Sequence, residues 1–172
     1  MSTEEKAFSI DFDNIGWLEG LEENPIDCCA HAHVVAHIGE ETFEYHATVS
    51  ATALYLLKSL SRNHVAYQEE QFLPCCGFNI IANKGDSGDV AILGCPSGID
   101  WTLVHIGDAV EITTDSGLKT VVSFGDYREE VLKFVDKVEA FYESQPPRKP
   151  AKDEALAYKA FWNEWHRRRR EA

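Results

Sequence analysis

Positive charge is nearly absent from the first fifty residues of this chain. Eleven carboxylates stand there beside a single basic side chain, Lys6, which gives the segment a formal charge of −10. Residues 51–100 carry −2 and residues 101–172 carry −1, so the total of −13 is concentrated at one end. An acidic surface attracts cationic partners and repels nucleic acid and anionic membranes. We therefore expect neither nucleic acid nor a membrane as a partner.

Long apolar runs are absent as well. No stretch approaches the roughly 18–20 apolar residues that cross a bilayer, and residues 1–6 have neither the basic start nor the apolar stretch of a signal peptide. Reduced thiols in a bacterial-type cytoplasm are the simplest interpretation of an odd cysteine count, so we expect a cytoplasmic protein. The five cysteines form two adjacent pairs and one single residue: Cys28, Cys29, Cys75, Cys76 and Cys95.

The sequence also lacks the common motifs of catalytic and phosphate-binding or calcium-binding sites. The sequence has no glycine-rich phosphate loop and no serine nucleophile elbow, and its aspartates do not follow the spacing of an EF-hand. Hydrophobic residues make up 44% of the chain and aromatic residues 11%, which is enough to build a core and excludes global disorder. These features favour a soluble acidic domain that binds a partner over an enzyme.

Residues 27–49 show the clearest pattern in the chain. Apolar residues alternate with polar ones up to Ile38, a turn is expected at Gly39-Glu40, and alternation resumes from Thr42. Both apolar sets must face the core, which fixes the register of the predicted hairpin. The pairs expected on the core face are Ala36 with Phe43, Val34 with Tyr45 and Ala32 with Ala47, and those on the other face are His33 with His46 and His31 with Thr48.

Three further elements are predicted downstream. Ser50 is expected to cap a helix over 51–62, and residues 101–124 read as a three-stranded meander with tight turns at Gly107 and Gly117. Asp126, with Glu129 three residues later, predicts a capped helix over 126–144. Together they predict an α+β fold, in which an antiparallel sheet from the 27–49 hairpin and the 101–124 meander packs against C-terminal helices.

A proline-rich segment divides the expected organisation. Residues 145–150 form a stiff linker, so we expect one α+β domain over 1–150, with its acidic N-terminal third, and a docked C-terminal helix over 151–172. That last helix carries an aromatic stripe which either packs in the core or anchors a partner: Phe161, Trp162 and Trp165. The basic run at its end, Arg167–Arg170, suits the helix dipole and nearby acids.

A histidine-rich strand face is the best candidate for chemistry. Alternate residues on a strand project to one side about 6.6–6.8 Å apart, and the predicted register brings a histidine of the neighbouring strand alongside. Three imidazoles with an open position are typical of a catalytic zinc site. The alternative is a solvated sheet face, with no cofactor bound. The candidate ligands are His31, His33, His46 and Cys29.

Two further cysteine segments carry weaker signals. The adjacent residues Cys75 and Cys76 lack the two-residue spacer of common zinc and redox motifs, which favours a role as small hydrophobic side chains. Cys95 sits in a glycine-flanked turn that suits a nucleophile, but Pro96 removes a backbone donor and favours a purely structural turn.

The segregated acids predict a partner-binding surface. Carboxylates complement the Lys and Arg side chains that hold phosphate in a nuclease, so the leading hypothesis is the neutralisation of a basic protein such as a nuclease toxin. A metal-dependent hydrolase and a non-catalytic oligomer, with a homodimer as its simplest form, are the other hypotheses. The acids expected to contact a partner are Glu19, Glu22, Glu23, Asp27, Glu40, Glu41 and Glu44.

Several segments also resemble a known group of proteins. They include Phe72-Leu73-Pro74-Cys75-Cys76-Gly77-Phe78, Gly94-Cys95-Pro96-Ser97-Gly98-Ile99-Asp100-Trp101, Gly125-Asp126-Tyr127, Phe141–Pro147 and Tyr158–Trp165. Over residues 70–166 the chain is similar to small uncharacterised bacterial cytoplasmic proteins, some of which look like immunity proteins of polymorphic toxin systems. The resemblance implies a fold type and points toward toxin neutralisation, and it does not cover the acidic N-terminal third.

Overall fold

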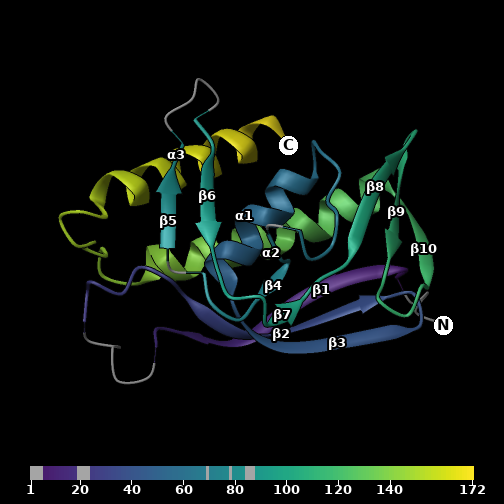
Figure 1. Cartoon of the computed structure of the whole chain (residues 1–172), viewed down its shortest axis with the longest axis horizontal. Helices are drawn as coiled ribbons and strands as arrows, with labels where there is room; N and C mark the ends of the chain where they lie inside the picture. The colour runs from purple at the N-terminus through teal and green to yellow at the C-terminus, as the bar shows by residue number, and fades with distance from the viewer. Residues whose placement is uncertain (1–5, 19–23, 69, 78, 84–87) are drawn as a thin grey trace.

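A three-stranded antiparallel sheet underlies the molecule (Figure 1). The computed structural model describes residues 6–18, 24–68, 70–77, 79–83 and 88–172. Within them, β1 (Phe8–Gly16), β2 (His31–Ile38) and β3 (Glu41–Thr48) pair in the order β1-β2-β3. The five pairs predicted for the β2–β3 hairpin are all present, from His31 opposite Thr48 to Ala36 opposite Phe43. The predicted register is therefore confirmed.

The meander forms a sheet of its own. Strands β8 (Thr102–Ile106), β9 (Ala109–Thr113) and β10 (Lys119–Ser123) pair in sequence order, and Gly107 and Gly117 adopt the positive φ that the tight turns require. The α+β class is thus confirmed, although the hairpin and the meander lie in separate hydrogen-bonded sheets and not in a single one. Two short strand pairs complete the fold: β4 (Leu73–Pro74) with β7 (Gly98–Ile99), and β5 (Asn79–Ala82) with β6 (Val90–Leu93).

The first helix runs through the centre of the molecule. Helix α1 (Val49–Ser59) is buried at every one of its positions. The predicted cap is wrong here, because the helix already begins at Val49 and Ser50 lies inside its first turn. The chain passes directly from β3 into the helix at Thr48, so the turn is held by surrounding structure instead of a capping side chain.

The second helix covers the inner face of the first sheet. Helix α2 (Phe124–Ser144) contacts β1 through the ring pairs Phe8–Tyr127 and Phe12–Phe134, whose centroids lie 4.9 and 5.0 Å apart. Its N-cap is Ser123, whose hydroxyl accepts a hydrogen bond from the Asp126 backbone nitrogen. The predicted cap at Asp126 was therefore three residues late, because the helix starts immediately where β10 ends.

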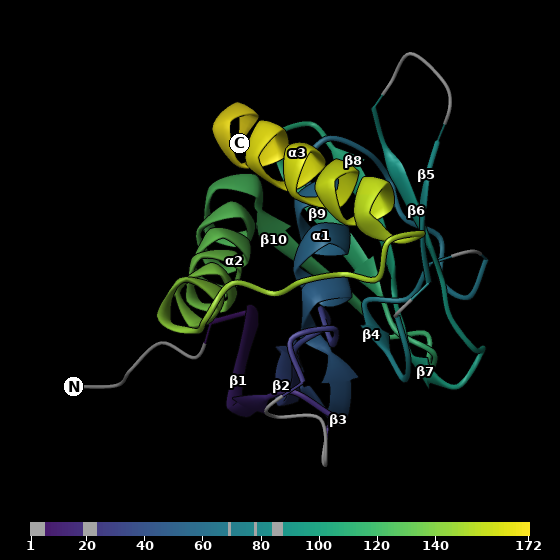
Figure 2. The same cartoon turned by 90° about the vertical axis from the view of Figure 1, so that its left-hand side faces the viewer.

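The last helix docks on the same core (Figure 2). In α3 (Ala155–Glu171), Phe161 and Trp165 are buried while Trp162 is half-buried, so the aromatic stripe belongs mainly to the core. Buried Glu164 accepts a hydrogen bond from the Val90 backbone nitrogen and pairs with Arg168. The neighbouring arginines bind acids on other elements, since Arg167 contacts Asp89 and Arg169 contacts Asp136. No helix in the described part of the chain is long and apolar enough to cross a membrane.

Candidate functional site: an outer sheet face and a cysteine cluster

One face of the β1-β2-β3 sheet is turned away from all three helices (Figures 1 and 2). Alternation places the apolar residues of these strands inward, where they are buried, and the polar residues outward. Within the described residues no helix or strand covers this surface, and most of its side chains are exposed or half-buried. We call it the outer sheet face, and it consists of Ser9, Asp11, Asp13, His33, Val35, His37, Thr42, Glu44 and His46.

His33 occupies the middle of this face between two carboxylates. Its Nδ1 lies 3.2 Å from Asp13 Oδ1 on β1, and its Nε2 lies 3.3 Å from Glu44 Oε2 on β3. Both acids keep most of their side chains in solvent, with exposed fractions of 66% for Asp13 and 63% for Glu44. The imidazole is thus held flat on the sheet, and the two carboxylates still present oxygen atoms to an approaching partner.

The predicted zinc ligands do not converge. The His31 and His46 rings stack with their centroids 6.0 Å apart, while both nitrogens of His33 face carboxylates. The Cys29 thiol is buried and bonds to the Gly77 carbonyl at 3.6 Å, and burial raises its pKa to about 12. In the described chain these four side chains do not fall into one metal-sized group, so a zinc site on them would require side-chain movement and stays a prediction.

The structure separates the predicted partner-binding acids. Glu40 and Glu44 are exposed, Glu40 at the β2–β3 turn and Glu44 on the outer sheet face. Asp27 instead accepts hydrogen bonds from the backbone nitrogens of Leu18 and Cys29. Glu41 is on the inner side of β3, where hydrogen bonds from Ser116 and Thr114 lower its pKa. Residues 19–23, with the predicted Glu19, Glu22 and Glu23, lie outside the described residues.

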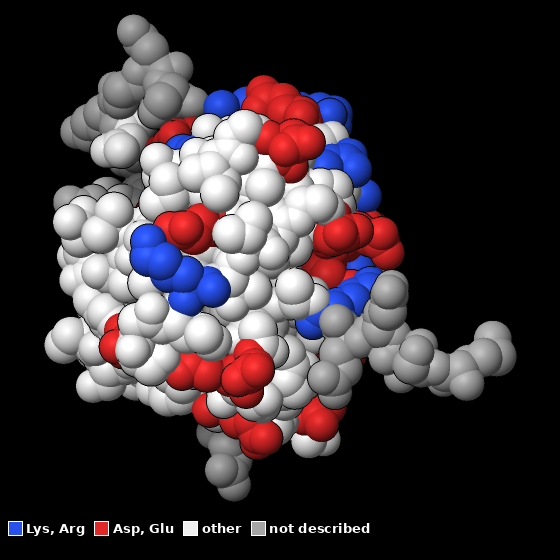
Figure 3. Space-filling view, turned by 90° about the vertical axis from the view of Figure 1, so that its right-hand side faces the viewer, with Lys and Arg blue, Asp and Glu red and all other residues white. Residues whose placement is uncertain are grey.

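Folding places basic side chains next to many of the acidic ones, so the charge asymmetry of the sequence is smaller on the surface. Figure 3 shows one side of the molecule, on which acidic patches alternate with Lys and Arg and do not merge into one surface. Ion pairs contribute to the mixing, because Lys137 of α2 reaches Asp11 of the distant β1 at 2.6 Å, and Lys119 reaches Glu111 on the adjacent strand at 2.9 Å. The distribution of charge along the sequence therefore does not predict its distribution on the surface, and the charge of the outer sheet face depends on the residues that lie on it.

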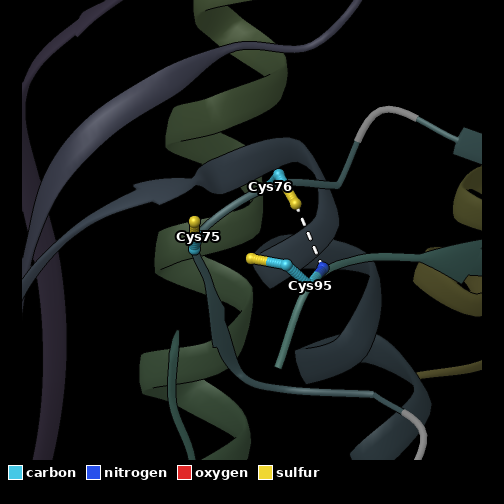
Figure 4. A group of neighbouring side chains, drawn as sticks. All are labelled: Cys75, Cys76 and Cys95. Atoms are coloured by element: carbon cyan, nitrogen blue, oxygen red, sulfur yellow. Dashed lines mark hydrogen bonds between the residues drawn. The ribbon is translucent and has the colours of Figure 1, made fainter. Parts of the chain in front are cut away.

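A second site joins three cysteines that are distant in sequence (Figure 4). Cys75 and Cys76 follow β4, and Cys95 lies in the connection between β6 and β7. Their sulfur atoms all lie within 4.8 Å of one another, and all three side chains are partly exposed. In Figure 4 the Cys95 sulfur extends toward Cys75, and the Cys76 sulfur faces the backbone nitrogen of Cys95. No other group of three His, Cys, Asp or Glu side chains in the described ranges is as compact.

Backbone geometry brings the two cysteine segments together. The β4–β7 pair sets Leu73 opposite Ile99, just before Cys75 and just after Cys95. A Cβ at Gly94 would lie only 2.6 Å from the Cys76 carbonyl oxygen, so only glycine allows this approach without movement of the backbone. The Cys95 N–H then donates to Cys76 Sγ at 3.1 Å. The approach of the two backbone segments is thus fixed by the strand pairing and by Gly94.

Two of the three thiols, Cys75 and Cys95, differ in acidity. Hydrogen bonding from the Cys75 thiol lowers the pKa of Cys95 to about 7, and the same contact raises the pKa of Cys75. A thiol with a pKa near neutrality is substantially ionised at physiological pH, and the thiolate is the form that attacks electrophiles and binds metals. The cluster joins cysteines whose sequence segments each carry only a weak separate signal, so it was not predicted from the sequence. The glycines at 77, 94 and 98 were the available signal, because glycine marks close backbone approach.

A small cavity adjoins the cluster. It has a volume of about 180 Å³, and its lining includes Cys76, Cys95 and Gln71. The Gln71 side chain is buried, and its Nε2 donates to the Pro96 carbonyl at 3.0 Å. Its Oε1 has no hydrogen-bond partner among the described residues. The cavity is smaller than the usual drug-sized pocket of about 300–1,000 Å³, so it suits water or a small ligand.

Comparison with known proteins gives no family. The chain matches no protein-family model, no curated protein and no solved structure. Its function therefore has to be argued from the two sites themselves.

Proposed function

We propose that this chain is a protein-binding domain whose outer sheet face holds a basic protein. The observation that supports the proposal is the pair of exposed carboxylates, Asp13 and Glu44, that flank His33 on a sheet face left open by every described helix and strand. Both acids face solvent from rigid strands, so little conformational entropy is lost when a partner binds them.

The carboxylates of the outer sheet face favour a partner with a positively charged surface. Carboxylates form their strongest hydrogen bonds with Lys and Arg, and Arg binds them in a bidentate manner. The exposed Glu40 at the β2–β3 turn extends the acidic character beyond the central pair. A nuclease is the concrete example of such a partner, because the basic side chains that hold phosphate would be occupied by these carboxylates. Immunity-type neutralisation of a toxin would work in this way.

The set of proposed contact residues differs from the one expected from sequence. Asp27 and Glu41 already accept internal hydrogen bonds, so their carboxylates would contribute little to the binding of a partner. Asp13 replaces them, because β1 carries it onto the same surface as Glu44, whereas Asp11 on the same strand is already paired with Lys137 at 2.6 Å. We propose Asp13, Glu40 and Glu44 as the acids that contact the partner.

The proposal is tested by charge reversal on the face. The chain is isolated from its own host under gentle conditions, the bound protein is identified by native mass spectrometry, and its Kd is measured against rising NaCl. The double variant Asp13→Lys/Glu44→Lys should weaken binding by at least about 10-fold, and the wild-type Kd should increase steeply with salt.

A matched control carries the same change in net charge elsewhere. Asp108 and Glu143 are exposed acids away from the outer sheet face, and Asp108→Lys/Glu143→Lys should change the Kd by less than about 3-fold. Equal weakening by both double variants would mean that net charge alone drives binding. A chain recovered only as a monomer or a homodimer, with no basic partner, would contradict the proposed function.

A further inference from the structure

We propose that Cys75, Cys76 and Cys95 bind one Zn²⁺ ion as three thiolate ligands, with a solvent molecule from the adjoining cavity as the fourth. The inference is independent of the protein-binding function, because it concerns a different part of the surface and a different class of ligand. Three thiol groups that converge from two chain segments are the observation that carries it.

The spacing of the sulfur atoms suits a single ion. With a zinc–sulfur distance of about 2.3 Å, a tetrahedral site places its sulfur atoms about 3.8 Å apart. The three sulfurs already lie within 4.8 Å of one another, so small side-chain rotations are sufficient to close the site. Soft thiolate ligands select zinc and similar thiophilic metals over magnesium or calcium, which prefer oxygen.

Contacts around the thiols support the same assignment. The Cys95 N–H donates to Cys76 Sγ at 3.1 Å, and hydrogen bonds of this kind disperse the negative charge of a metal-bound thiolate. The adjoining cavity, whose lining includes Cys76 and Cys95, has room for the solvent molecule that completes the site.

The number of cysteines favours a metal over a disulfide. A disulfide would join two of the three sulfurs and leave the third with no partner of its kind, whereas a metal ion uses all three. The structure records every cysteine of the described chain as a free thiol, including these three. The site also differs from the second adjacent pair, Cys28-Cys29, which lies near no third cysteine.

Zinc binding is measured on the full chain, kept reduced with a phosphine that does not bind metals. Zinc stoichiometry by elemental mass spectrometry should be one ion per chain, and affinity follows from competition with a chromogenic chelator. Co²⁺ in place of zinc should show a thiolate-to-metal charge-transfer band with the intense visible bands of tetrahedral coordination.

Two variants separate the cluster from a general effect of losing a thiol. Cys95→Ser removes one ligand and should weaken zinc binding by at least about 100-fold, since changes outside the ligand set already cost about 10–100-fold. Cys28→Ser removes a half-buried cysteine of the other pair and should retain full stoichiometry. If Cys95→Ser fails to fold, Cys75→Ser tests the same site from the other segment.

Three results would overturn the proposal. They are a wild-type chain that holds no zinc, a Cys95→Ser variant that binds zinc as tightly as the wild type, and a Co²⁺ spectrum without a thiolate band. Loss of zinc only in His33→Ala/His46→Ala would instead assign the metal to the outer sheet face. The partner-binding test is unaffected by either outcome, because Asp13→Lys/Glu44→Lys leaves all three cysteines in place.

Discussion

The chain contains two Cys-Cys pairs that look alike in sequence and have opposite environments in the structure. Cys28 and Cys29 lead into β2, where burial raises their thiol pKa values to about 11 and about 12. Cys75 and Cys76 instead lie beside Cys95, a third cysteine whose thiol pKa is lowered to about 7. The Cys-Cys sequence therefore does not determine the acidity of its thiols, because their pKa values depend on the residues that the fold places beside them.

The contacts of the two pairs explain the difference. Around the first pair, the Tyr142 hydroxyl donates to the Cys28 carbonyl at 2.6 Å and accepts from the Ala30 N–H at 3.0 Å, so the segment is held by its backbone. The second pair is held near Cys95 by the β4–β7 pairing and by Gly94. One pair thus serves the packing of the core, and the other presents its sulfur atoms to one another.

The largest expected contrast is in thiol reactivity. At pH 7 about half of Cys95 is thiolate, against about one molecule in 100,000 for Cys29. The greater intrinsic nucleophilicity of a high-pKa thiolate offsets only about 100-fold of this ratio. In metal-free protein, iodoacetamide should label Cys95 at least about 100-fold faster than Cys29, as followed by peptide mass spectrometry. Equal labelling rates would remove the distinction between the two pairs.

Alkaline stability provides the next contrast. The Cys29 thiol has a pKa of about 12 in the folded chain against 9.0 for the model thiol. The unfolded chain loses this proton first, so the free energy of unfolding falls as pH rises above 9, by about 2 kcal/mol at pH 10.5. Cys29→Ala should lack this part of the decline in urea unfolding between pH 8 and 10.5.

Cys95→Ala is the control for that titration. The folded pKa of Cys95 is about 7, so its thiol is already ionised in the folded state at pH 9, and only the unfolded chain, with a thiol pKa near 9.0, still loses protons there. This adds a rise of only about 0.4 kcal/mol between pH 9 and 10.5, opposite in sign to the Cys29 contribution, so Cys95→Ala should keep the wild-type decline and steepen it slightly. A slope that is the same for Cys29→Ala and the wild type would show that Cys29 is not protected in the fold.

A glycine substitution tests how the cysteine cluster is held. The Cβ of Gly94→Ala would meet the Cys76 carbonyl oxygen at 2.6 Å, so the backbone must shift, at a cost of about 1 kcal/mol in unfolding free energy. The same shift should separate Cys95 from Cys76 and weaken zinc binding. Gly16→Ala, where no atom lies within 4 Å of the added Cβ, should change stability by less than about 0.5 kcal/mol. Equal losses of stability and of zinc affinity in Gly94→Ala and Gly16→Ala would show that Gly94 does not hold the cluster together.

The hairpin could be predicted in detail because its information is local. Alternation with a period of two, together with a turn of known length, leaves one register that buries both apolar sets. The structure has that register, including His33 opposite His46. The meander turns were accessible for a similar reason, since Gly107 and Gly117 mark the backbone conformation that each turn needs.

The helix starts and the cysteine cluster depended on information that no local pattern contains. Ser50 looks like a cap, yet the strand before it runs directly into α1, and the helix begins one residue earlier. Cys95 comes nineteen residues after Cys76, and their contact depends on the two-residue β4–β7 pair, which is too short to leave a periodic pattern. The outer sheet face could be predicted only in part, since the hairpin pattern supplies β2 and β3 but does not place β1 beside β2.

The buried charge on α1 has a consequence for how the chain assembles. Lys58 is almost completely buried between two carboxylates, Glu70 at 3.0 Å and Glu164 on α3 at 3.7 Å. Glu70 is near Lys58 in the sequence, but Glu164 has no exposed surface and reaches this position only when α3 docks. During synthesis α1 emerges long before α3, so this buried ion pair cannot form until the last helix arrives. We expect cooperative folding to follow the completion of α3, with the earlier segments kept in a loose, protease-sensitive state until then.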